Sequence, residues 1–215
     1  MEHLTNSITN NSITNNNIQL IPEEQLNKDV LYFDVETDGY GGFNPPKQNL
    51  IQLAWIFNGT RHSYLIKGVQ SINPQVPHKI TPQMLNEQGL EFSDVWKLFS
   101  TDFNKANYIV AHNIAFDSGI ISRELLINDL DVSVIQRFKN KCKKYGICTM
   151  KETTEFCKLE KVGNSKLYPG YKWPRLTELH QKLFGTEPSE EMHDALNDCV
   201  VTERCYLRCR QLRVF

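Results

Sequence analysis

Three segments rich in β-branched and aromatic residues follow one another early in the chain. They read DVLYFDVET, NLIQLAWIF and RHSYLIK, and residues such as Gly, Pro and Asn separate them. Segments of this composition form β-strands, and the residues between them form turns. Because short connections join neighbouring strands in opposite directions, we expect a three-stranded antiparallel meander.

Helical patterns and one further strand follow the meander. Thr81 and Pro82 provide an N-cap and a first-position proline for a helix ending at Glu87. Apolar residues recur at helical spacing in EFSDVWKLFSTDF, and YIVAH is expected to be a buried strand. Further helices are predicted over FDSGIISRELLI, CTMKETTEFCK, PRLTELHQKLF and residues 189–211. This order predicts an α/β domain with a mixed sheet flanked by helices.

The length of 215 residues suits one such domain. Residues 7–16 read SITNN twice, a composition that buries too little apolar surface to offset the entropy of ordering. We therefore expect a disordered tail over 1–20 and the folded domain over 28–213.

Global charge gives no sign of a nucleic-acid partner, because 24 basic residues stand against 25 acidic ones. The amino terminus lacks a secretion signal, and the longest apolar stretch, LIQLAWIF, is too short to cross a bilayer. We expect a cytoplasmic protein without a membrane partner. The six cysteines form no CxxC pair, which favours reduced thiols over disulfides or a zinc site.

Two carboxylates share one face of the first predicted strand. The period of two places Asp34 and Glu36 together, opposite Leu31, Phe33 and Val35. Neighbouring anions on an apolar strand require a cation, whereas the same pair on an edge strand would simply face solvent. The strand alone leaves both interpretations open.

Further polar residues recur where later elements begin. Asp117 starts a helix directly after the strand YIVAH, and His193 lies five residues before Asp198 near the start of the last helix. The carboxyl ends of strands in α/β sheets are common positions for functional sites. Each residue alone is also typical of a helix cap or first turn.

The full series of motifs, FDVETDG, AHNIAFD and HDALND, resembles the DnaQ-like exonucleases of the DEDDh class, from about Val30 to Leu207. This resemblance implies a ribonuclease-H-like fold and 3′→5′ hydrolysis of phosphodiester bonds. The five residues it assigns to catalysis are Asp34, Glu36, Asp117, His193 and Asp198. One departure is Asp38, where many relatives carry threonine, so an extra carboxylate could alter contacts with metal or substrate.

The resemblance also implies a site for two Mg²⁺ ions, with Mn²⁺ as a substitute. Four acids would hold them: Asp34, Glu36, Asp117 and Asp198. Carboxylates suit these hard cations, and two metals can share the charge that develops in phosphodiester hydrolysis. His193 is the candidate general base, because imidazole titrates near neutrality.

Contacts with the terminal nucleotide are expected from the backbone of Thr37 and Gly39. Thr81, Met84, Asn113 and Phe116 are further candidates, although Met84 and Phe116 are equally typical of core packing. The basic segment RFKNKCKK (137–144) could reach upstream phosphates or be a solvated helix face.

We therefore expect an enzyme that releases 5′-mononucleotides from single-stranded or frayed DNA 3′ ends. One alternative is an RNA-directed enzyme similar to oligoribonuclease or RNase T. Another is a non-catalytic module that binds nucleic acid or a polymerase, although all four acids are retained. A DNA polymerase or repair protein is a further candidate partner.

Overall fold

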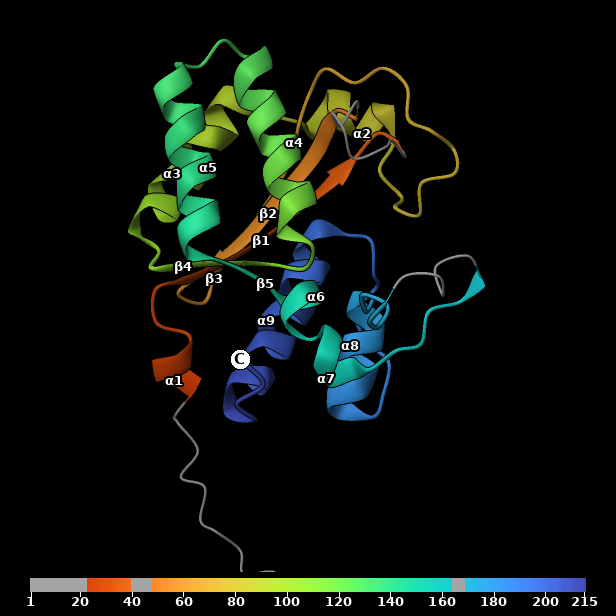
Figure 1. Ribbon diagram of the computed structural model, residues 1–215. Helices are drawn as coiled ribbons and strands as arrows, with labels where there is room; N and C mark the ends of the chain where they lie inside the picture. Colours follow the sequence, from red (N-terminus) through yellow and green to blue (C-terminus); the bar gives the residue numbers. More distant parts are fainter. Residues whose placement is uncertain (1–22, 40–47, 164–168) are drawn as a thin grey trace, which may run out of the picture.

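The computed structural model describes residues 23–39, 48–163 and 169–215. The tail predicted over 1–20 lies outside these residues. The described chain forms a five-stranded sheet with helices on both faces (Figure 1), as expected.

The sheet has the strand order β3-β2-β1-β4-β5. The predicted meander is confirmed, because its three strands pair antiparallel in sequence order. β4 and β5 continue the sheet in parallel. The sequence did not predict β5, which has only three residues. The strands are β1 (Val30–Thr37), β2 (Leu50–Phe57), β3 (Thr60–Leu65), β4 (Tyr108–Ala111) and β5 (Gly146–Cys148).

β1 is the central strand, so the solvated-edge interpretation of its acidic residues is wrong. Its side chains alternate between two hydrophobic cores, as the period of two predicts. Leu31, Phe33 and Val35 belong to one core, and Tyr32 belongs to the other. Asp34 and Glu36 therefore share the face that carries Tyr32.

Three helices pack on the first core: α3 (Phe92–Lys105), α4 (Ile114–Ile127) and α5 (Val132–Tyr145). Figure 1 shows them together on one side of the sheet. Phe99 of α3 is fully buried and its ring contacts four aromatic neighbours, Phe33, Trp55, Trp96 and Phe103. This aromatic cluster attaches α3 to β1 and β2.

α9 (Ala195–Gln211) covers the opposite face of the sheet and packs against α8 (Leu176–Phe184). α9 begins later than the predicted residue 189, because Asp194 is its N-cap and accepts hydrogen bonds from the first-turn amides. The predicted helix over CTMKETTEFCK is divided into α6 (Thr149–Glu152) and α7 (Thr154–Cys157).

Two predicted helix boundaries, the start of α2 and the end of α8, are confirmed. α2 (Pro82–Gln88) has Thr81 as its N-cap, with the hydroxyl oxygen accepting from the Met84 amide. α8 ends at Gly185, whose φ of 78° lies in the left-handed region that glycine adopts easily. A short α1 (Glu23–Leu26) precedes β1.

All six cysteines have free thiols. Within the described ranges, no helix has the length and apolar character needed to span a membrane.

We expect Phe99→Ala to lower the free energy of unfolding by about 3–5 kcal/mol, because it opens a cavity among four rings. Urea denaturation would measure the change. The adjacent Leu98 is 47% exposed, so Leu98→Ala is the matched control and should cost less than about 1 kcal/mol. Equal losses in the two variants would contradict the assigned core.

Candidate active site

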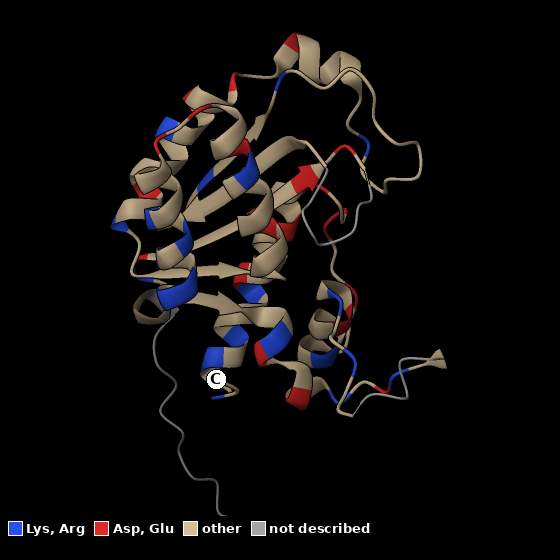
Figure 2. Cartoon of the chain, turned by 45° about the horizontal axis from the view of Figure 1, so that its top comes forward, with Lys and Arg blue, Asp and Glu red and all other residues tan. Residues whose placement is uncertain are grey.

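Three carboxylates meet at the end of the central strand. One oxygen each from Asp34 and Glu36 of β1 and Asp198 of α9 lie within 4.8 Å of one another. Figure 2 shows acidic segments from separate elements converging at this edge of the sheet. The structure thus brings together residues that are more than 160 positions apart in the chain.

Gln52 and Asp194 hold the start of α9 against the sheet. Gln52 of β2 donates from Nε2 to Asp194 Oδ2 at 2.9 Å, and its Oε1 accepts from the Ala195 amide at 3.1 Å. Asp194 Oδ1 in turn accepts from the amides of Leu196 and Asn197. Asp194 therefore has a structural role, and Asp198 one turn later is directed at Asp34. No sequence pattern indicated this role of Gln52, because its partner lies in a distant element.

Asp117 reaches the same region from α4. β4 pairs with β1 only as far as Tyr32, so the part of β1 after Tyr32 has no partner strand on that side. The Asp117 Oδ1 atom accepts from the Val35 amide there at 3.2 Å. Asp117 is only 2% exposed, and it lies next to the cluster of three carboxylates without belonging to it.

The pKa values of all four acids are raised, and the nearby Asp194 contributes to the rise at Asp34, Glu36 and Asp198. Burial is the largest cause at each residue, and the neighbouring carboxylates add repulsion. The pKa of Asp34 is raised well above its usual value, that of Glu36 to about 8, that of Asp117 to about 8 and that of Asp198 to about 7. No basic side chain is within salt-bridge distance of these acids in the described part of the chain.

Oxygen donors with excess negative charge fit a hard divalent cation. Such an ion would replace the missing positive charge and allow all the acids to ionise. The side chains that could hold it directly are Asp34, Glu36 and Asp198, with Asp117 beside them.

His193 lies at the rim of this cluster on the residue before the α9 cap. Its φ of 68° is left-handed, and its backbone amide donates to Asp198 Oδ1 at 3.3 Å. The side chain is exposed. Although the residue is exposed, desolvation at this rim and the nearby His78 lower its pKa, which favours the neutral imidazole that can accept a proton.

A pocket of 430 Å³ opens beside the carboxylates. Four of the predicted substrate contacts line it, namely Thr37, Gly39, Asn113 and Phe116, together with Glu36 and His193. Phe116 also packs against the first core. Met84 instead lines an adjacent pocket of 210 Å³, which shares His78 and His193 with the first. Thr81 lines neither pocket, because its hydroxyl caps α2.

His78 is a pocket residue that sequence reasoning missed. It is 8% exposed, and its Nε2 donates to the Thr37 carbonyl at 2.9 Å while Nδ1 accepts from the Ile80 amide at 3.3 Å. The imidazole therefore connects the segment before α2 to the end of β1. In the sequence, only its position three residues before the predicted N-cap Thr81 placed it near this region.

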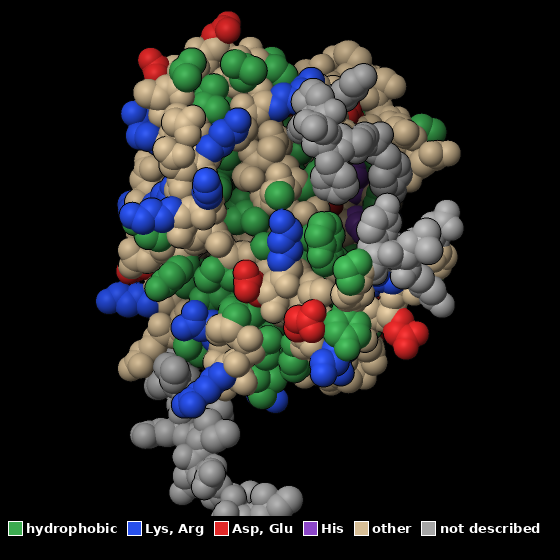
Figure 3. Space-filling model, in the orientation of Figure 1, with side chains coloured by type: hydrophobic (Ala, Val, Ile, Leu, Met, Phe, Trp, Pro, Cys, Tyr) green, Lys and Arg blue, Asp and Glu red, His purple; other side chains and the backbone are tan. Residues whose placement is uncertain are grey.

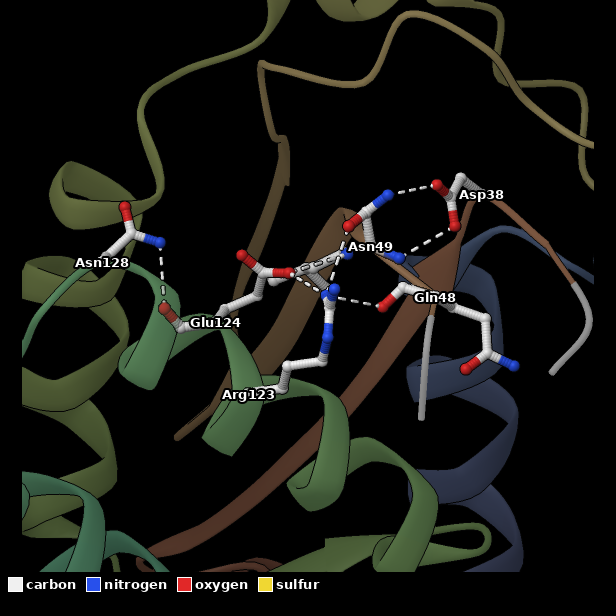
Figure 4. A network of polar contacts seen from close by, with 7 residues as sticks. Asp38, Gln48, Asn49, Arg123, Glu124 and Asn128 are labelled. Atoms are coloured by element: carbon white, nitrogen blue, oxygen red, sulfur yellow. Dashed lines mark hydrogen bonds and ion pairs between the residues drawn. The ribbon is translucent and has the colours of Figure 1, made fainter. Parts of the chain in front are cut away.

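Asp38 does not join the carboxylate cluster. Its Oδ1 accepts from the Asn49 amide at 2.8 Å and its Oδ2 accepts from the Asn49 side chain (Figure 4). Arg123 of α4 extends this network to the Asn49 side chain and the Gln48 carbonyl. The extra carboxylate therefore helps to join the segments after β1 and before β2.

Comparison with known proteins identifies the family. A model described as the RNase T exonuclease family matches residues 31–206, which contain all five motif residues. The chain belongs to this exonuclease family. Its fold is accordingly ribonuclease-H-like, as the motifs predicted. No curated protein sequence gives a significant match.

Solved structures with the same fold include nucleases. A 3′-exonuclease that recognises the 3′ end of a histone mRNA stem-loop has a TM-score of 0.57 at 15% identity, covering 85% of this chain and 63% of that one. This chain thus spans less than two thirds of that nuclease. Cell-death related nuclease 4 has a TM-score of 0.50 at 12% identity, covering 86% of this chain and 65% of that one.

A further similar chain comes from the structure of the yeast NOT1 MIF4G domain co-crystallized with CAF1. Its TM-score is 0.58 at 13% identity, and the match covers 89% of this chain and 83% of that one. At identities this low, the three structural matches show only that the fold is shared.

The raised pKa values predict how metal-free stability depends on pH. Glu36 binds its proton more tightly in the folded state than in the unfolded state. The stability that this proton contributes to the fold is therefore complete at low pH and is lost as pH rises to about 8. We expect Glu36→Gln to change the melting temperature little at about pH 4. At pH 8, with a chelator present, it should raise the melting temperature by a few degrees.

Thermal unfolding across this range would measure the difference between variant and wild type. Glu91→Gln, at an exposed acid of the α3 N-cap, is the control and should give a constant difference. A constant difference for Glu36→Gln as well would contradict the crowding of the carboxylates.

Proposed function

We propose that this chain is a metal-dependent 3′→5′ exonuclease that releases 5′-mononucleotides from single-stranded or frayed DNA. The observation that carries the proposal is the cluster of Asp34, Glu36 and Asp198 within 4.8 Å, next to a pocket of 430 Å³. A pocket of this size, at the end of β1, fits a single nucleotide. The bond presented to the carboxylates is therefore the phosphodiester bond that joins the 3′-terminal nucleotide to the rest of the nucleic acid.

Each acid has a defined part in this proposal. Asp34, Glu36 and Asp198 would hold the Mg²⁺ ions directly, and Asp117 would help to hold them from α4. Mn²⁺ would fit the same oxygen donors. The bound ions would make water more acidic and neutralise charge on the phosphoryl and leaving oxygens.

The remaining residues position substrate and move the proton. The neutral imidazole of His193, at the rim between both pockets, would take the proton from the attacking water. Asn113 and Phe116 would contact the sugar or base of the terminal nucleotide, beside the backbone of Thr37 and Gly39. His78 would keep Thr37 in place through the bond to its carbonyl.

RNA is the second candidate substrate. It is favoured by the similar 3′-exonuclease whose structure concerns histone mRNA. DNA and RNA oligomers of the same sequence, each with a 3′-hydroxyl, distinguish the two: a higher kcat/KM on RNA would replace DNA in the proposal.

Asp34→Asn should reduce hydrolysis by about 1,000-fold or more, because it removes the central metal-binding oxygen and several kcal/mol of charge stabilisation. The measurement is release of 5′-mononucleotides from 3′-labelled single strands with magnesium or chelator. Asp94→Asn, at an exposed residue of α3 paired with Lys97, is the control and should retain full activity. Undiminished hydrolysis by Asp34→Asn would refute the assignment.

His193→Gln tests the proton acceptor separately from the metal residues. We expect kcat to fall by about 100- to 10,000-fold, as for loss of a general base. Stabilisation by magnesium in thermal unfolding should persist, because the four acids remain. If kcat is unchanged, another group accepts the proton.

A further inference from the structure

A groove of 520 Å³ lies between α4, α5 and α6, and it shares no lining residue with the nucleotide pocket. Three lysines line it: Lys139 and Lys143 from α5, and Lys151 from α6. No acidic side chain is among the described residues that form its walls. Figure 3 shows several Lys and Arg side chains on the face that carries α4, α5 and α6. We call this feature the lysine groove.

The lysines of the basic segment 137–144 do not all face this groove. Lys139 and Lys143 are four residues apart and share one face of α5. Lys141 points elsewhere and donates to the carbonyls of Phe103 and Asn104 at the end of α3. Lys139 and Lys143 are exposed and form no ion pair with a described acidic residue.

Small residues of α4 form the floor of the groove. Ala115, Ser118, Gly119 and Ser122 line it at helical spacing. Their short side chains leave open space between the lysines of α5 and α6.

The first turn of α4 separates the groove from the nucleotide pocket. Asn113 and Phe116 line the pocket, whereas Ile114 and Ala115 line the groove. Asp117, in the same turn, contacts β1. A strand that leaves the carboxylates therefore needs to pass only one helical turn to reach the lysines.

An exposed aromatic ring stands next to the groove. Trp173 is 56% exposed, and the Lys151 Nζ atom lies 5.7 Å from the centre of its ring. His112 fixes this segment: its Nε2 donates to the Pro174 carbonyl at 3.0 Å, and its Nδ1 accepts from the Thr149 hydroxyl at 2.9 Å. The motif that supplies Asp117 thus also positions the tryptophan.

We propose that the lysine groove binds the phosphodiester backbone of a single strand upstream of the scissile bond, with one base stacked on Trp173. Lysine ammonium groups contact phosphates, and aromatic rings stack with any base, so the groove suits single strands without sequence preference. This inference rests on the proposed exonuclease function, since it assigns the path of the same substrate.

The first test compares a dinucleotide with a single strand of about 20 nucleotides, which is longer than a typical binding site. In the variant with Lys139, Lys143 and Lys151 all changed to Gln, KM for the long strand should rise about tenfold or more. The dinucleotide ends before the groove, so its kcat/KM should stay unchanged. A matched control changes Lys97, Lys105 and Lys182 to Gln, which removes equal charge from α3 and α8, and should leave both substrates unaffected.

Binding gives a readout that does not require catalysis. In the Asp34→Asn background, the salt slope of long-strand affinity should decrease by about 2, because each single-strand phosphate contact contributes about 0.7. The other two tryptophans, Trp55 and Trp96, are buried, so quenching of tryptophan fluorescence by the strand should disappear in Trp173→Phe.

Wild-type KM and salt slope in the triple variant, or equal losses in the control, would overturn the inference. If the unmodified chain hydrolyses neither substrate, the exonuclease proposal fails. The salt slope and the fluorescence would then still decide whether the groove binds a strand.

Discussion

The crowding and partial burial of four carboxylates at the end of β1 is the constraint on which the rest of this structure depends. Asp34, Glu36, Asp117 and Asp198 come from three elements, and burial together with repulsion from neighbouring carboxylates, including Asp194, raises their pKa values. Such an arrangement is unfavourable without a cation, so the fold must hold it in place. The stability of the two cores provides this support, because both cores pack directly on β1.

Each acid outside β1 is held by hydrogen bonds that do not involve the other three acids. Asp117 accepts from the Val35 amide where β4 stops pairing, and Gln52 binds the α9 start through Asp194. The first turns of α4 and α9 also form the walls around the four acids. α4 separates the nucleotide pocket from the lysine groove, and the residue before the α9 cap is His193.

The sequence predicted those features that depend on local periodicity. The alternation along β1 correctly placed Asp34 with Glu36, and the Thr81 cap correctly placed the start of α2. Helical spacing correctly placed Asp117 in the first turn of α4, although α4 begins at Ile114, before the predicted segment FDSGIISRELLI. The predicted start of α9 at residue 189 was wrong, because Asp194 caps the helix after a non-helical stretch. β5 was missed because three residues carry no usable period. The roles of Gln52 and His78 depend on distant partners, which one sequence does not reveal.

The most direct test of the central claim is anomalous diffraction from crystals grown with Mn²⁺ and a 5′-mononucleotide. Manganese accepts the same oxygen ligands as magnesium and has a measurable anomalous signal. The account predicts anomalous density between Asp34, Glu36 and Asp198, with the nucleotide in the pocket lined by Asn113 and Phe116. Density at other residues, or carboxylates that remain without a cation at saturating Mn²⁺, would contradict it.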